Sequence, residues 1–89
     1  MLEPFYKNKF KQDVVRMKKR GKQLKKLQEV ISMLIDQHEL PLKYRDHSLL
    51  GQYNNCRECH IEPDWLLIYL IEGKDLIFIR TGTHSDLFV

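Results

Sequence analysis

The chain has 89 residues, of which 43% are hydrophobic and 30% are charged, and its net charge at neutral pH is +3. This length predicts one domain over residues 1–89, and the composition is that of a soluble globular protein. The longest apolar run, residues 65–71, is too short to span a bilayer, and the N-terminus lacks the apolar core of a signal peptide. The sequence therefore predicts a cytoplasmic protein without membrane association.

Positive charge is concentrated at the N-terminal end. Ten of the 15 Lys and Arg residues lie in residues 1–26, which hold only two of the 12 acidic residues. Such a distribution suggests an anionic partner, either nucleic acid, an acidic protein or a membrane surface, although a solvated lysine-rich helix face has the same pattern. The cations that we expect to bind such a partner are Lys18, Lys19, Arg20, Lys22, Lys25 and Lys26.

The first half of the chain is predicted to be mainly helical. Residues 2–6 form at most a short edge strand, because Pro4 cannot donate a backbone hydrogen bond. Residues 8–20 and 22–38 each carry apolar side chains at helical spacing, and Gly21 between them is well placed to end the first helix. The pattern indicates an antiparallel helical hairpin with one apolar face and one basic face.

The second half changes to the period of a β-strand. Residues 53–62 alternate in polarity, whereas residues 65–71 are apolar at both odd and even positions. Residues 76–82 form a further predicted strand after a turn at 72–75. A strand that is apolar on both sides should lie in the centre of a sheet covered on both faces. The sequence therefore predicts an α+β fold in which the two helices pack on an antiparallel sheet of three to four strands.

A C-x-x-C-H motif at residues 56–60 has the spacing by which c-type haem is attached. Successive residues of a strand point to opposite faces, so a strand over 53–62 would separate the side chains of Cys56 and Cys59. Both sulfur atoms could then not readily bind one haem or one zinc ion. We interpret Cys59 as a core residue and Cys56 as a bystander on the polar face, with no cofactor or metal.

Several ionisable residues could gather on the polar face of strand 53–62. That face carries Glu58 and His60. Four further residues are inferred to lie near them, from the alternation of side chains along the strands and from the chain topology. They are Asp64 in the following turn, Arg80 in strand 76–82, His84 just beyond that strand, and His47 in the polar loop 44–51. A single histidine in a small protein is more often a hydrogen-bonded structural residue, so the cluster carries more weight than its members.

This set of side chains suits cleavage of RNA without a metal ion. Imidazoles titrate near neutral pH and can exchange protons, and an arginine can stabilise negative charge on a phosphate in the transition state. Trp65 and Phe88 could stack on unpaired bases, although Trp65 fits a core position equally well. The chemistry indicated is transesterification, in which one group activates the 2′-hydroxyl and another protonates the 5′-oxygen.

Three segments closely resemble the YafQ branch of the RelE superfamily, bacterial type II toxins that act as ribosome-dependent mRNA endonucleases. They are YRDHSLLG (44–51), RECHIEPDWLLIYL (57–70) and RTGTHSDLF (80–88). The first half of the chain resembles the family only in its two basic helices. The resemblance implies cleavage of mRNA in the ribosomal A site, inhibition of translation, and neutralisation by a cognate antitoxin protein.

The resemblance also implies roles for individual residues. It implies catalytic roles for His47, His60, Asp64 and His84, support of the phosphate by Arg80, positioning of RNA by Trp65 and Phe88, and docking of the basic helices on the rRNA of the 70S ribosome. We expect His60 or His47, with or without Asp64, to be the general base and His84 the general acid. We expect Glu58 to help bind the substrate, but it stands where the family often has aspartate, so whether it has a catalytic role stays open.

Two other interpretations fit the sequence. A non-catalytic module of the same fold would bind RNA or an antitoxin without cutting RNA. A metal-dependent hydrolase would use the three clustered histidines and Asp64 as ligands, which suit zinc or manganese. The sequence has no H-x-x-x-H or E-x-x-H spacing that would fix two ligands on one element.

Overall fold

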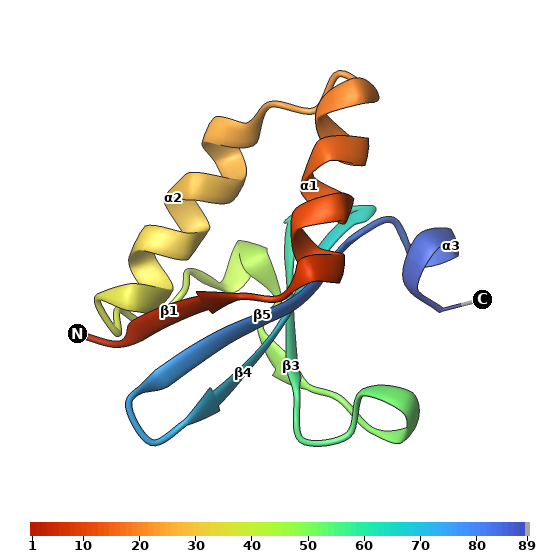
Figure 1. The fold of residues 1–89 in the computed structure, drawn as a ribbon. Helices are drawn as coiled ribbons and strands as arrows, with labels where there is room; N and C mark the ends of the chain where they lie inside the picture. The colour runs from red at the N-terminus through yellow and green to blue at the C-terminus, as the bar shows by residue number, and fades with distance from the viewer. Residues whose placement is uncertain (89) are drawn as a thin grey trace.

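The computed structural model describes residues 1–88 and shows a five-stranded sheet with two helices packed on one of its faces (Figure 1). The strands are β1 (Glu3–Tyr6), β2 (His47–Ser48), β3 (Arg57–Glu62), β4 (Trp65–Glu72) and β5 (Asp75–Gly82), in the order β1-β5-β4-β3-β2. The helices are α1 (Asn8–Lys19), α2 (Leu24–Ile35) and the short α3 (His84–Leu87), with 3₁₀ turns at Leu42–Tyr44 and Gly51–Tyr53. The predicted α+β fold is confirmed.

The sheet differs from the predicted one in strand number and direction. β1 lies parallel to β5, with Glu3 opposite Asp75, whereas the other pairs are antiparallel. The two-residue β2 adds a fifth strand at the opposite edge, where His47 lies opposite Glu58. Hydrophobic periodicity is the same for either strand direction, so the sequence pattern could not reveal that the sheet is mixed.

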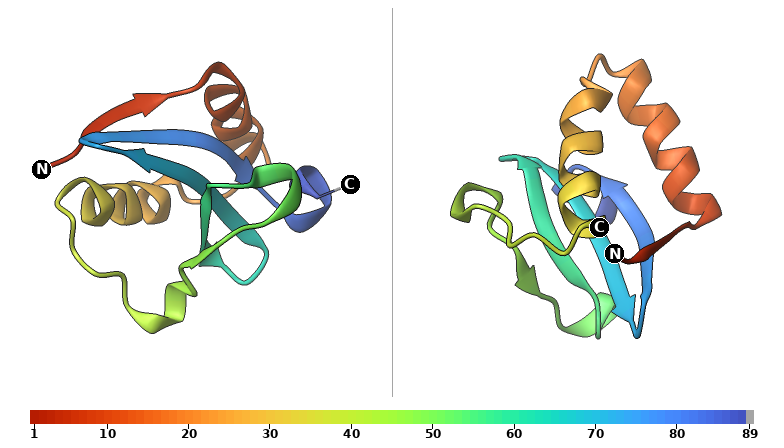
Figure 2. Two further views of the ribbon diagram at one scale, coloured as in Figure 1. Left: turned by 90° about the horizontal axis from the view of Figure 1, so that it is seen from below. Right: turned by 90° about the vertical axis from the view of Figure 1, so that its left-hand side faces the viewer.

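The two long helices are shorter than their predicted ranges. Gly21 ends α1 as expected, because it has a φ of +84° and its N–H donates to the carbonyl of Lys18 at 3.0 Å. α2 ends at Ile35, and Gln37 adopts a left-handed φ of 60°. Both helices lie on the same side of the sheet (Figure 2). None of the described helices is long and apolar enough to cross a membrane.

The main core fills the space between the helices and the sheet. Phe10 and Met17 of α1 and Val30 of α2 are at most 3% exposed, and they pack in one cluster with side chains of β3, β4 and β5. The alternate residues Leu66 and Ile68 of β4 lie in a second, smaller core on the other face. The prediction that this strand is covered on both sides is therefore confirmed.

The second core also takes in Cys56 and Leu87, with Tyr53 packed against it. Cys59 lies in the main core, so the two cysteines are on opposite faces, as parity predicted. The expectation that Cys56 is a bystander is wrong, because this residue, just before β3, is buried in the second core. Burial raises the pKa of both thiols, which disfavours the thiolate needed for nucleophilic attack or metal binding.

Candidate active site

Three histidines form a row on the face of the sheet that carries the second core. His47 comes from β2, His60 from β3, and His84 is the first residue of α3. The ring centroids of His47 and His60 are 6.2 Å apart, and those of His60 and His84 are 5.9 Å apart. The structure thus brings together the three histidines that the sequence indicated, and we call them the histidine row.

Glu58 is a buried carboxylate between two members of the histidine row. Its Oε2 lies 3.5 Å from Nε2 of His47, and its Oε1 lies 3.4 Å from Nε2 of His60. The Glu58 side chain is only 6% exposed, and a buried charge is costly without partners. An imidazole that carries a proton on Nε2 can be such a partner, so Glu58 is placed to stabilise a positive charge on either ring.

The other ring nitrogens of these two histidines face backbone carbonyls. Nδ1 of His47 is 2.6 Å from the carbonyl oxygen of Arg45, and Nδ1 of His60 is 3.3 Å from that of Pro63. A carbonyl oxygen can only accept, so each Nδ1 carries the proton. In the neutral ring, Nε2 is then free to accept a proton, with Glu58 beside it to stabilise the resulting imidazolium.

Asp64 fixes the third histidine from the turn between β3 and β4. Its Oδ1 accepts hydrogen bonds from Nδ1 of His84 at 2.6 Å and from the backbone N–H of His84 at 2.9 Å. These bonds lower the pKa of the Asp64 carboxyl, with the backbone bond as the largest cause, so the carboxylate is ionised at neutral pH. Asp64 therefore orients the ring of His84 through Nδ1, which leaves Nε2 of that ring available to a substrate.

A separate set of contacts anchors the loop that carries His47. Asp46 accepts from Nε and Nη2 of Arg57 at 3.3 and 3.0 Å and also from the hydroxyl of Tyr69. Tyr69 is 1% exposed, and the pKa of its hydroxyl is raised. Burial is the largest cause, and the hydrogen bond to Asp46 is the second. Sequence reasoning missed Asp46 and Tyr69, and the only signal was the position of Asp46 next to His47.

A β-bulge decides which face Arg80 takes. Arg80 lies opposite Ile68 and Phe78 lies opposite Tyr69, with Ile79 as the extra residue. Regular alternation along the predicted strand 76–82 would put Phe78 and Arg80 on one face. With the bulge they differ, since Phe78 is in the main core and Arg80 is in register with Ile68 of the second core.

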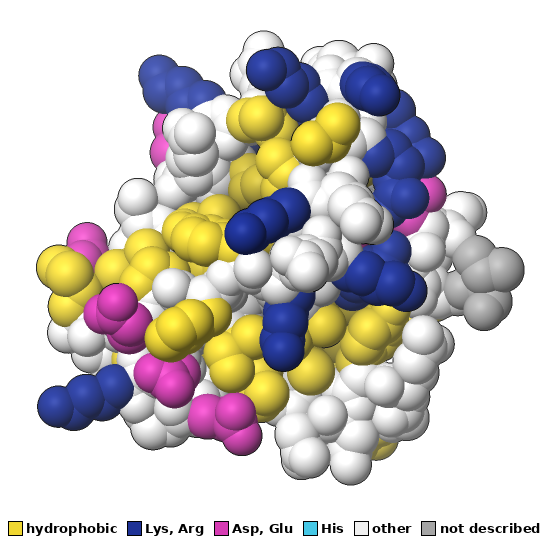
Figure 3. Space-filling view, viewed as in Figure 1, with side chains coloured by type: hydrophobic (Ala, Val, Ile, Leu, Met, Phe, Trp, Pro, Cys, Tyr) yellow, Lys and Arg dark blue, Asp and Glu magenta, His cyan; other side chains and the backbone are white. Residues whose placement is uncertain are grey.

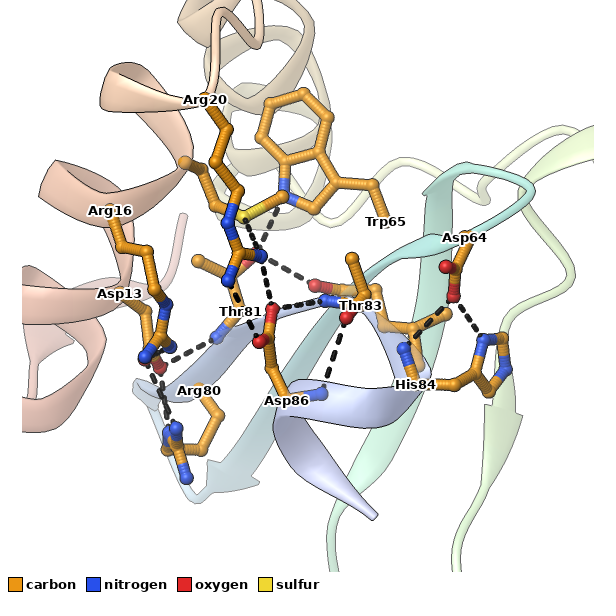
Figure 4. A network of polar contacts seen from close by, with 12 residues as sticks. Asp13, Arg16, Arg20, Asp64, Trp65, Arg80, Thr81, Thr83, His84 and Asp86 are labelled. Carbon is orange, nitrogen blue, oxygen red and sulfur yellow. Dashed lines mark hydrogen bonds and ion pairs between the residues drawn. The ribbon is translucent and has the colours of Figure 1, made fainter. Parts of the chain in front are cut away.

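The guanidinium of Arg80 is bound by a buried aspartate of α1. Asp13, 2% exposed, accepts from Nε of Arg80 at 2.6 Å and from Nη2 at 3.0 Å. It also accepts from the backbone N–H of Thr81 at 3.1 Å and forms an ion pair with Arg16 (Figure 4). Asp13 thereby joins α1 to the end of β5, which leads to His84.

Trp65 does not lie where RNA could reach it. Its side chain is 0% exposed, and its Nε1 donates to Oγ1 of Thr81 at 2.9 Å (Figure 4). The expectation that Trp65 positions RNA is therefore corrected: it is a core residue. Phe88 is 42% exposed, and its ring centroid lies 6.3 Å from that of His84, so it extends the histidine row with an accessible aromatic face.

The predicted basic surface is partly neutralised within the protein. Arg20 pairs with Asp86, and the ammonium groups of Lys22 and Lys26 both contact Glu62, at 2.7 and 2.9 Å. The remaining three, Lys18, Lys19 and Lys25, are exposed and have no ion pair within residues 1–88. Lys and Arg side chains gather over α1 in Figure 3, and no histidine is seen on that face.

The fold and the site define a small α+β protein with a row of three histidines, each beside a carboxylate. The family model for the YafQ bacterial toxin of type II toxin-antitoxin systems matches residues 2–89. The mRNA interferase toxin YafQ of Escherichia coli K12 is 43% identical over 84 residues, which cover 93% of this chain and 91% of that protein. The chain therefore belongs to the YafQ family of bacterial toxins, and the resemblance seen in the sequence is confirmed.

Solved structures support the same assignment. The Escherichia coli DinJ-YafQ complex matches with a TM-score of 0.92 and 40% identity over the whole of both chains. The metal-bound toxin from Helicobacter pylori matches with a TM-score of 0.92 and 40% identity, covering 99% of this chain and all of that one. In residues 1–88 of the present chain, no group of three or more His, Cys, Asp or Glu side chains is arranged to hold a metal ion.

Proposed function

We propose that this protein is an mRNA interferase that cuts mRNA in the ribosomal A site and so inhibits translation in the cytoplasm. The observation that carries the proposal is the histidine row, in which every ring is oriented by a carboxylate or a carbonyl. The name of the Escherichia coli relative, mRNA interferase toxin, supports the same activity. The DinJ-YafQ complex supports a cognate antitoxin as the protein's partner.

The general base comes from the pair of histidines that Glu58 joins. Nε2 of His60 or His47 takes the proton of the 2′-hydroxyl, and the 2′-oxygen attacks the phosphorus. Glu58 stabilises the imidazolium that forms, because its carboxylate lies within 3.5 Å of both Nε2 atoms. Asp64 takes no part in this step, since its hydrogen bonds are with His84.

His84 acts as the general acid on the opposite side of the phosphate. With Nδ1 bonded to Asp64, its Nε2 donates a proton to the 5′-oxygen as the bond between phosphorus and that oxygen breaks. The products are a 2′,3′-cyclic phosphate and a 5′-hydroxyl end. Arg80 adds positive charge near the phosphate, and Phe88 provides a surface on which a base stacks.

A hollow beside the histidine row offers room for a neighbouring nucleotide. Its volume is about 460 Å³, and His60, Tyr44 and Arg45 are among the residues that line it. A ring and a guanidinium are the groups on which unpaired bases commonly stack. We place the nucleotide that flanks the scissile phosphate in this hollow.

The Glu58→Gln variant is expected to cut mRNA roughly 10- to 100-fold more slowly, because a hydrogen bond to a charged group contributes about 1.5–3 kcal/mol. Glutamine keeps the shape of the side chain but cannot stabilise an imidazolium. The rate constant of single-turnover cleavage on programmed ribosomes measures the effect. Glu72→Gln, at an exposed position on β4, is the matched control, and equal rates for the two variants would contradict a role for Glu58.

The exposed lysines are expected to bind ribosomal RNA through its phosphates. Replacing Lys18, Lys19 and Lys25 together with glutamine should weaken ribosome binding and reduce the slope of log K against log salt by about three, because each lysine neutralises about one phosphate. Binding measured over a series of salt concentrations tests this. Lys74→Gln, in the exposed turn between β4 and β5, should leave the slope unchanged. An unaltered slope in the triple variant would remove these lysines from the interface.

The chemistry of the product ends tests the proposed reaction. mRNA cut on ribosomes should carry 5′-hydroxyl and 2′,3′-cyclic phosphate ends, with the same rate when a chelator of zinc and copper is present. That chelator must leave the magnesium of the ribosome in place. Ends with 5′-phosphate, or activity that disappears with the chelator and returns with added metal, would favour the metal-dependent hydrolase. Binding to ribosomes without any cut would favour the non-catalytic module.

A further inference from the structure

An ion pair joins the C-terminal end of α1 to α3, the helix that begins with His84. Nη1 of Arg20 lies 2.7 Å from Oδ2 of Asp86, and Nη2 lies 3.1 Å from Oδ1 (Figure 4). Each nitrogen thus has its own oxygen, which is the two-bond arrangement that fixes orientation best. The bond from Arg20 is also the largest cause of a strong lowering of the pKa of the Asp86 carboxyl.

The same carboxylate holds the backbone next to His84. Oδ2 of Asp86 accepts from the N–H of Thr83 at 2.9 Å, and the N–H of Asp86 donates to Oγ1 of Thr83 at 3.2 Å. The approach to β5 is close, since a Cβ atom on Gly82 would lie 2.9 Å from Oδ2 of Asp86. Asp86 is therefore packed into the turn that leads to His84, and Arg20 holds it from the opposite side.

α3 depends on such contacts because it has only four residues. Helices of this length are not stable alone, and their position is set by tertiary contacts. Leu87 anchors one side in the second core, where the hydroxyl of Tyr53 donates to its carbonyl at 3.1 Å, and Asp64 binds His84. The pair of Arg20 and Asp86 ties α3 to the layer of long helices.

We propose that Arg20 and Asp86 are positioning residues, which set the place of His84 in the proposed cleavage reaction. The sequence predicts that Arg20 binds the ribosome, but its guanidinium is paired with Asp86 within the protein. This inference rests on the proposed role of His84. A reacting group displaced by about 1 Å can lower the rate 10²-fold, so removal of the pair lowers kcat and leaves binding to the ribosome unchanged.

The kinetics of four variants distinguish whether Arg20 positions His84 or binds the ribosome. Arg20→Gln and Asp86→Asn should each lower kcat by roughly 10- to 100-fold, and the double variant should be no slower than either single one, because both remove the same ion pair. Arg20→Lys should recover only part of kcat, since an ammonium cannot form the two parallel bonds. Lys11→Gln, at an exposed position of α1 with no role in binding or cleavage, is the matched control and should leave kcat unchanged.

The opposite kinetic pattern would overturn the proposal. If Arg20→Gln raises KM for the ribosome and lowers the salt slope by about one while kcat stays the same, Arg20 binds a phosphate of the ribosome. Additive decreases of kcat in the double variant would likewise show that Arg20 and Asp86 do not act together.

NMR spectra of the free protein test the role of this ion pair without any cleavage reaction. In Arg20→Gln, the backbone and ring signals of His84 should shift, whereas those of His47, which lies beyond His60 in the histidine row, should stay in place. Unchanged His47 signals also show that the variant is folded. If wild-type protein cuts no mRNA, the proposed function fails, yet the shift at His84 still tests the pair. Unmoved His84 signals would overturn it.

Discussion

The His84→Ala variant is expected to cut mRNA about 10²- to 10⁴-fold more slowly than the wild type, which is the usual contribution of a general acid. The His84 side chain is 54% exposed, and within residues 1–88 its ring forms a hydrogen bond with Asp64 alone, so its removal should hardly affect folding. Single-turnover cleavage of mRNA on ribosomes, together with a thermal unfolding curve, measures both effects.

His38→Ala is the matched control for this experiment. His38 is the one exposed histidine outside the histidine row, and it follows α2, where its N–H donates to the carbonyl of Met33 at 2.9 Å. Its replacement should leave cleavage unchanged. Cleavage at the wild-type rate by His84→Ala would remove His84 from the chemistry and, with it, the proposed role of Asp64.

The Trp65→Ala variant is expected to lower the free energy of unfolding by about 3–5 kcal/mol. Trp65 is 0% exposed within the main core, so truncation leaves a large cavity and takes away the donor bonded to Thr81. Natural domains are stable by only about 5–15 kcal/mol, so this decrease is a large share of the total. Urea unfolding of the purified protein gives the value.

Two further variants separate a core role of Trp65 from contact with RNA. Trp65→Phe keeps an aromatic ring in the core and should cost much less than Trp65→Ala. Phe88→Ala removes an aromatic ring that is 42% exposed, so it should weaken cleavage with little effect on the unfolding curve. A Trp65→Ala protein of normal stability and raised KM would instead place Trp65 at the RNA.

The repeat of apolar and polar side chains along single helices and strands predicted much of this structure correctly. The apolar stripes predicted the two helices correctly, and alternation predicted that Cys56 and Cys59 lie on opposite faces, as they do. The predicted strand 53–62 was too long, however, because Gly51–Tyr53 is a 3₁₀ turn, Asn55 has a left-handed φ of 71° and β3 begins at Arg57. Alternation put His60 on the polar face, and chain topology predicted that His47 and His84 lie near it, as their ring distances confirm. These inferences succeeded because a strand or a helix imposes its period on each side chain locally.

The contacts that sequence reasoning missed join residues far apart in the chain. Asp13 lies among the lysines of the first basic helix, yet it is the buried partner of Arg80, 67 residues away. Arg20 looked like one more cation of that helix, and its partner Asp86 is 66 residues away. The bulge at Ile79 also cannot be seen in the sequence. It puts Phe78 and Arg80 on different faces, because one extra residue changes the face of all that follow.

The central claim is that this protein cuts mRNA on the ribosome, and mapping 5′ ends in a purified translation system tests it most directly. A defined mRNA is incubated with the protein, with and without ribosomes, and the new ends are located to the nucleotide. The account predicts cuts that keep the reading frame, require ribosomes and disappear with His84→Ala. An mRNA that stays intact with the wild-type protein, or is cut equally without ribosomes, would contradict it.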